Sequence, residues 1–78
     1  MKGALSFNQK MEIVLEEGFT PKEKWVIRTW YDLESEDEDI STERLLAMTS
    51  EMTNTDYGKI PSIMDKFSRK FDKVFGDK

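Results

Sequence analysis

The apolar residues of the C-terminal segment recur with the period of an α-helix, and this pattern constrains the fold more than any other feature. The positions that share this helical face are Ile60, Ile63, Met64, Phe67, Phe71, Val74 and Phe75. On a helical wheel they form a single stripe about 120° wide, which a folded chain must cover. We therefore predict a helix that begins near Ile60 or Pro61 and ends at Gly76, with Phe67 and Phe71 buried.

Two helices nearer the N-terminus are predicted from capping-box patterns. In such a box the hydroxyl of the N-cap residue and a side chain three residues later satisfy the free N–H groups of the first turn. Ser6 precedes a predicted helix over Phe7–Glu17. Thr20 precedes a second over Pro21–Leu33, where Glu23 completes the box and proline suits the first helical position.

The segment Trp25–Tyr31 also carries residue types that favour β-strands, so strand is the alternative for this stretch. We favour helix because the cap at Thr20 precedes it and no second convincing strand is available for pairing. On that helix Trp30 lies on the apolar face and Trp25 lies off it. Trp25 is therefore a candidate anchor for a partner protein, and the alternative is that it packs under the first helix.

A third helix is predicted over Thr42–Thr53, with Ser41 as its N-cap and with Leu45, Met48 and Met52 facing the core. It is preceded by an acidic stretch, residues 34–39, which carries five carboxylates in six residues. Because like charges repel each other and resist burial, we predict a solvated loop there. Its candidate partner-binding residues are Glu36, Asp37, Glu38 and Asp39.

The net charge of −4 conceals a strong segregation, since residues 34–58 carry a net −7 and residues 59–78 a net +3. The cations of the last predicted helix gather beside its apolar stripe. We call this group the basic strip: Lys59, Lys66, Arg69, Lys70 and Lys73. One interpretation is a surface that contacts phosphates or an acidic partner. The alternatives are a solvated face whose lysine stems cover apolar edges, or a face turned toward the acidic stretch.

The chain is chemically bare, because it contains no His and no Cys. Thiol nucleophiles, zinc ribbons and the commonest general base are thereby excluded, and no spacing links a nucleophile to a base. A calcium loop beginning at Asp32 would place Glu43 at the bidentate position, but Asp37 stands where the sharp turn needs glycine and Asp39 where an apolar residue is expected. We expect no enzymatic activity, no metal and no cofactor.

These observations predict an all-α protein, a single small domain over residues 1–78 made of four short amphipathic helices in a bundle or orthogonal array. Residues 1–15 contain no apolar run suited to a signal peptide, nothing approaches a membrane span, and we expect a cytoplasmic protein. The function predicted is a non-catalytic regulator or adaptor that occupies the surface of a partner protein, and a homo-oligomer is a separate alternative for its assembly. The alternative is a DNA-binding helix-turn-helix formed by helices about 42–53 and 60–75, although the turn between them lacks glycine.

Overall fold

The computed structural model describes residues 5–76, and helices are the only regular secondary structure in that part of the chain. The elements, in chain order, are α1 (Phe7–Leu15), α2 (Pro21–Glu36), α3 (Thr42–Thr53), the 3₁₀ helix η1 (Tyr57–Lys59) and α4 (Ile60–Phe75). The all-α prediction is confirmed, and the ambiguous segment 25–31 lies within α2. The expected domain span of 1–78 includes residues 1–4 and 77–78, which lie outside the described residues.

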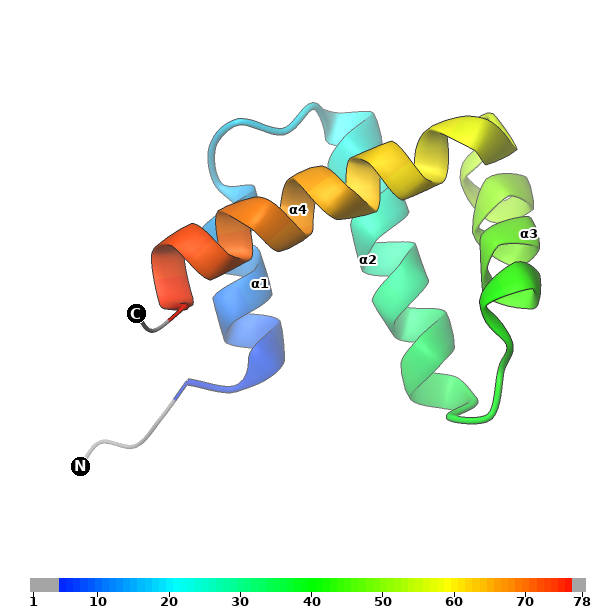
Figure 1. Ribbon diagram of the computed structural model, residues 1–78, viewed down its shortest axis with the longest axis horizontal. Helices are drawn as coiled ribbons and strands as arrows, with labels where there is room; N and C mark the ends of the chain where they lie inside the picture. The colour runs from blue at the N-terminus through cyan, green and yellow to red at the C-terminus, as the bar shows by residue number, and fades with distance from the viewer. Residues whose placement is uncertain (1–4, 77–78) are drawn as a thin grey trace.

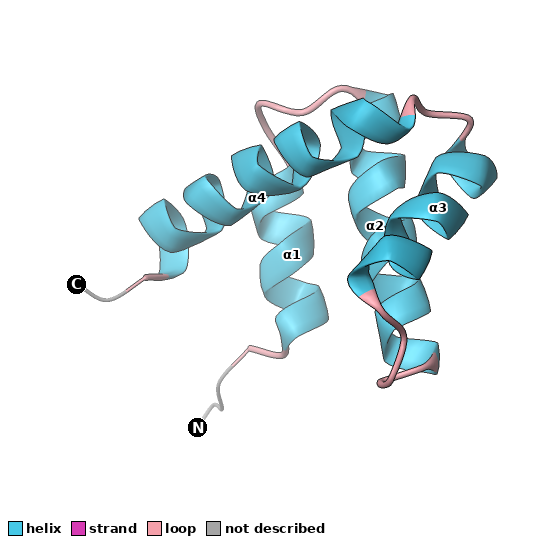
Figure 2. Cartoon of the chain, turned by 45° about the vertical axis from the view of Figure 1, so that its right-hand side comes forward, coloured by secondary structure: helices cyan, strands magenta, loops and turns pink. Residues whose placement is uncertain are grey.

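The long helix α4 lies across the other helices and joins them (Figure 1). It packs on both α1 and α2, which run in opposite directions beneath it, while α3 packs along α2 on the side away from α1 (Figure 2). The described chain measures 40 × 27 × 21 Å. An ion pair also ties α2 to α1, since Arg28 Nη2 lies 2.6 Å from Glu12 Oε1.

Both predicted capping boxes are present. The Ser6 N–H donates to Gln9 Oε1 at 2.8 Å, and the Gln9 N–H donates to Ser6 Oγ at 3.2 Å. The Thr20 N–H donates to Glu23 Oε1 at 2.9 Å, and the Glu23 N–H donates to Thr20 Oγ1 at 3.1 Å. Helix α1 ends two residues earlier than predicted, and Gly18, at a φ of 85°, turns the chain toward α2.

The core is built where α4 meets α1, α2 and the linker between them. Its buried members are Met11, Val14, Leu15, Phe19, Val26, Ile27, Ile60, Ile63 and Phe67. Phe67 is 1% exposed and lies in a cluster of rings, with its centroid 5.7 Å from that of Tyr31 and 6.4 Å from that of Phe19. Its predicted burial is confirmed. Phe71 is only partly buried, because it lies at the edge of the core and stacks on Phe7 at 5.5 Å.

Helix α2 extends through Glu36, so the predicted loop over 34–39 is wrong for its first three residues. Their side chains are exposed on the last turn, where carboxylates keep their hydration without leaving the helix. The loop itself begins at Asp37.

Helix α3 buries a different face from the one predicted. Leu45, Thr49 and Thr53 are buried, whereas Met52 is 55% exposed and Met48 is half-buried. A threonine hydroxyl that bonds to the carbonyl one turn earlier leaves its methyl group to pack on a neighbouring helix, and Thr53 Oγ1 donates to the Thr49 carbonyl at 2.7 Å. The Thr49 hydroxyl oxygen is buried and forms no hydrogen bond within the described residues. Two threonines therefore form the face that packs on α2, and Met52 is left in solvent.

Candidate protein-binding surfaces

Two lysines of the basic strip are engaged within the fold. Lys66 Nζ lies 3.0 Å from Glu23 Oε1 and 4.8 Å from the centroid of the Phe19 ring. Lys70 Nζ donates to the Glu17 carbonyl and lies 5.4 Å from the same ring, and the residue is half-buried, so the expectation of a solvated face is wrong for Lys70. These contacts join α4 to the linker between α1 and α2 and to the first turn of α2. The interpretation that these lysines face the acidic stretch is therefore wrong.

The rest of the basic strip lies in solvent. Arg69 is exposed and pairs with Asp65 one turn earlier, at 2.8 Å between Nε and Oδ2. Lys59 in η1 and Lys73 near the end of α4 are exposed and form no ion pair with any residue in the range 5–76. Among the described residues, Lys59 and Lys73 are the two cations of the strip that form neither an ion pair nor a side-chain hydrogen bond.

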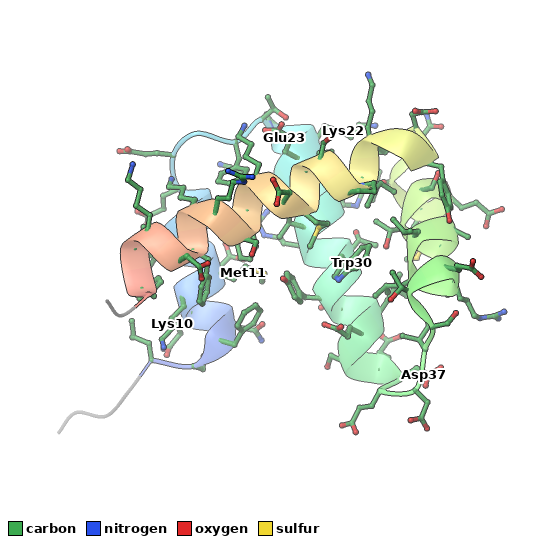
Figure 3. The ribbon with its side chains drawn as sticks, in the orientation of Figure 1. Lys10, Met11, Lys22, Glu23, Trp30 and Asp37 are labelled. Atoms are coloured by element: carbon green, nitrogen blue, oxygen red, sulfur yellow. The ribbon has the colours of Figure 1, made fainter. Side chains whose placement is uncertain are left out.

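The carboxylates of the acidic stretch, unlike Lys66 and Lys70, form no ion pairs or hydrogen bonds that hold the helices together in the described part of the chain. Glu36, Asp37, Glu38 and Asp39 are all exposed, and no carboxylate of the stretch takes part in an ion pair among residues 5–76. The Asp37 carboxylate accepts the Asp39 N–H at 3.1 Å, which shapes the turn but leaves the charge in place. Figure 3 shows Asp37 at the opposite end of α2 from Lys22 and Glu23. The structure therefore concentrates uncompensated negative charge at this end of the molecule.

Beside the acidic stretch lies a groove of about 500 Å³ between the first turn of α1 and the last turns of α2. We call it the aromatic groove, and its lining residues are Ser6, Phe7, Asn8, Tyr31, Glu34, Ser35 and Glu38. Phe7 is 44% exposed although its ring meets Tyr31 edge-on at 4.8 Å. The Phe7 ring also stacks on Phe71 of α4, with 5.5 Å between the ring centroids.

The electrostatics of the aromatic groove are negative. Glu34 and Glu38 are its charged lining residues, and both are exposed. Burial raises the pKa of the Tyr31 phenol above its ordinary value, and the charge of Glu34 raises it further. Both effects disfavour an additional negative charge in the groove.

Trp25 lies at the other end of α2, near the C-terminus of α3. Its ring is 49% exposed, which confirms that it projects away from the core, and the alternative of packing under α1 is wrong. Lys22 Nζ lies 5.6 Å from the ring centroid and donates to the Thr53 carbonyl at 2.8 Å, so this tryptophan sits beside the last turn of α3. Trp30, by contrast, packs against the core (Figure 3).

Neither a metal centre nor a membrane span is found in the part of the chain that the structure describes. No three acidic side chains among residues 5–76 converge closely enough to hold a metal ion. None of the helices there combines the length and the apolar character that a bilayer crossing requires.

No protein-family model matches this sequence, and no curated protein or solved structure is significantly similar to it.

Proposed function

We propose that this chain is a small non-catalytic regulator or adaptor that acts by occupying the surface of a partner protein in the cytoplasm. The observation that carries the proposal is the end of α2, where unpaired carboxylates adjoin the exposed ring of Phe7. Large aromatic side chains are the usual anchors of protein interfaces, and surrounding charges steer the encounter. The lack of cysteine is compatible with a reducing compartment.

Trp25 offers a second candidate contact with the partner. It is exposed at the opposite end of α2, and the Lys22 ammonium beside its ring leaves the rest of the indole accessible. A tryptophan of this exposure can supply a large apolar contact area with little loss of side-chain entropy. The Trp25→Ser variant removes that contact without opening the core.

Affinity capture tests the proposal directly. The full chain, immobilised at one end, is incubated with extract of its native cell, and bound proteins are eluted by excess free chain. We expect at least one protein to be retained in stoichiometric amount and then to rebind when purified. Trp25→Ser is compared in parallel, with Glu51→Gln on the exposed side of α3 as a matched control. Retention of no protein above the level of a blocked resin would contradict the proposal.

DNA binding through a helix-turn-helix is the second candidate, and the exposed cations of α4 favour it. Arg69 and Lys73 project into solvent from the helix that would read the groove. Against it, Lys66 and Lys70 are engaged within the fold. A labelled DNA duplex titrated at low and moderate salt separates the two functions, because phosphate contacts produce a steep dependence of affinity on salt.

A further inference from the structure

We infer that the aromatic groove binds a basic segment of a partner protein, with an arginine or lysine of that segment lying against Phe7 and Tyr31 and between Glu34 and Glu38. The inference rests on the proposed function, because it names the chemistry of the partner and the surface that the partner occupies.

The floor of the groove suits the flat face of a guanidinium or the stem of a lysine. Phe7 is 44% exposed and Tyr31 is partly buried, and their rings meet edge-on with centroids 4.8 Å apart, while Phe7 also stacks on Phe71. Cations are attracted to aromatic faces, and this fold already uses such contacts, since Lys66 and Lys70 both lie over Phe19. A lysine or arginine of a partner could form the same kind of cation–π contact with Phe7 and Tyr31 in the groove.

The walls of the groove supply the complementary charge. Glu34 and Glu38 line it from the last turn of α2 and from the loop that follows, and no lysine or arginine of residues 5–76 is among its lining residues. The neighbouring Glu36, Asp37 and Asp39 extend the negative potential outward. An incoming basic segment is thus steered toward the groove and then paired inside it.

The basic strip of a second copy is a poorer occupant than another protein. Lys66 and Lys70 are held by Glu23 and by the Glu17 carbonyl, so docking them into a second molecule would break those contacts. Arg69 already forms an ion pair with Asp65 of the same helix. The remaining cations, Lys59 in η1 and Lys73 near the C-terminus of α4, are separated by most of the length of α4 and cannot enter one groove together.

The test uses the full chain, labelled with ¹⁵N, and a short blocked peptide in which two arginines flank Leu-Phe. A second peptide carries citrulline at both arginine positions, which keeps the shape and removes the charge. We expect saturable amide shifts confined to residues 6–8 and 31–38. The citrulline peptide should bind about tenfold more weakly, and so should the arginine peptide toward the Glu34→Gln/Glu38→Gln variant. Added salt should weaken binding further.

The matched control is Glu16→Gln/Glu51→Gln, which removes two exposed carboxylates away from the groove and should leave peptide binding unchanged. A circular dichroism melt of each variant verifies that the helices persist. Three results would overturn the inference: no shifts with the arginine peptide, shifts located elsewhere, or equal binding of the citrulline peptide. Self-association in sedimentation that requires Glu34 and Glu38 would overturn it too, since the occupant would then be a second copy.

Failure of this inference is distinguishable from failure of the proposed function. A captured partner protein that binds the Glu34→Gln/Glu38→Gln variant as tightly as the unaltered chain leaves protein binding intact and overturns the groove assignment. Groove-specific peptide shifts without any captured protein support the groove chemistry and contradict the proposed function.

Discussion

Lys22, in the first turn of α2, donates hydrogen bonds to the Thr53 carbonyl at 2.8 Å and to the Asn54 carbonyl at 3.1 Å, so it caps the C-terminus of α3 from 31 residues away. The last carbonyls of a helix have no partner within the helix and carry partial negative charge, which a cation stabilises. Asn54 ends α3 in the left-handed conformation, with a φ of 52°, and so exposes these carbonyls to Lys22. This contact therefore joins the N-terminus of α2 to the C-terminus of α3.

Replacing Lys22 with Met should therefore reduce the free energy of unfolding by about 1 kcal/mol, since it removes a charge-assisted hydrogen bond at a partly exposed site. The measurement is chemical denaturation followed by circular dichroism. Lys73→Met is the matched control, because that lysine is exposed and forms no ion pair among the described residues. Equal losses in the two variants would show that the cap contributes nothing.

Substitution of Phe67 tests which face of α4 is buried in the core. This residue is 1% exposed and contacts three other aromatic rings, so Phe67→Ala should cost about 3–5 kcal/mol, the usual loss for a buried aromatic. In a domain this small that loss approaches the total stability. Val74→Ala on the same helix is the control, since Val74 is 47% exposed and should change stability little. Urea denaturation of both variants checks the contrast, and a larger loss for Val74 would reverse the assignment of the two faces.

Glu23 links stability to acid pH. The Thr20 N–H that it accepts holds the pKa of its carboxyl below the ordinary value of 4.5, with Lys66 adding to the effect against the opposing cost of burial. A lowered pKa means that folding favours the carboxylate, so this contribution to stability is present above pH 4.5 and lost as the pH falls through the lower folded-state value.

The Glu23→Gln variant should consequently be less stable than the unaltered chain at neutral pH, and the difference should shrink in acid. Thermal melts over a pH series measure it. Glu16→Gln is the matched control, because it removes one exposed carboxylate and leaves the capping box of Thr20 and Glu23 intact. A difference that stays constant from neutral to acid pH would mean that the charge of Glu23 does not contribute.

Local patterns were sufficient to predict the helices. The boxes at Ser6 and Thr20 act within one turn, and the stripe of α4 repeats over four turns, so neither depends on a distant part of the chain. They also decided between helix and strand for Trp25–Tyr31. The end of α2 was harder to predict, because carboxylates on an exposed last turn are compatible with both helix and loop.

The surfaces could be predicted only in part, because they depend on contacts between distant segments. Nothing local to α4 indicates that Lys66 reaches Glu23, 43 residues earlier, or that Lys70 reaches Glu17, 53 residues earlier. The aromatic groove has the same origin, since Phe7 and Tyr31 meet where α1 and α2 are held together by α4 and by the ion pair between Glu12 and Arg28. The exposure of Trp25 was predictable, since it follows from the position of one residue on one helix.

The ionisation of Tyr31 reports on the electrostatics of the aromatic groove. Burial raises the pKa of its phenol above the ordinary value of 10.0, and the charge of Glu34 adds to this effect. The chain has two tyrosines, so in a Tyr57→Phe variant the tyrosinate absorbance comes from Tyr31 alone. We expect its midpoint above pH 10.0 and a lower midpoint when Glu34→Gln is added, with Glu51→Gln as the control that leaves it unchanged.

The raised pKa of Tyr31 also has a consequence for stability at alkaline pH. Folding favours the neutral phenol, so this contribution to stability is fully present below pH 10.0 and is lost as the pH rises through the higher folded-state value. The free energy of unfolding of the Tyr57→Phe variant should therefore fall across that range, and Tyr31→Phe in the same background should remove that part of the fall. Urea denaturation at a series of alkaline pH values measures both. Should Glu34→Gln raise the midpoint instead of lowering it, the carboxylate does not act on the phenol, and the negative potential that the groove needs to attract a cation is absent at Tyr31.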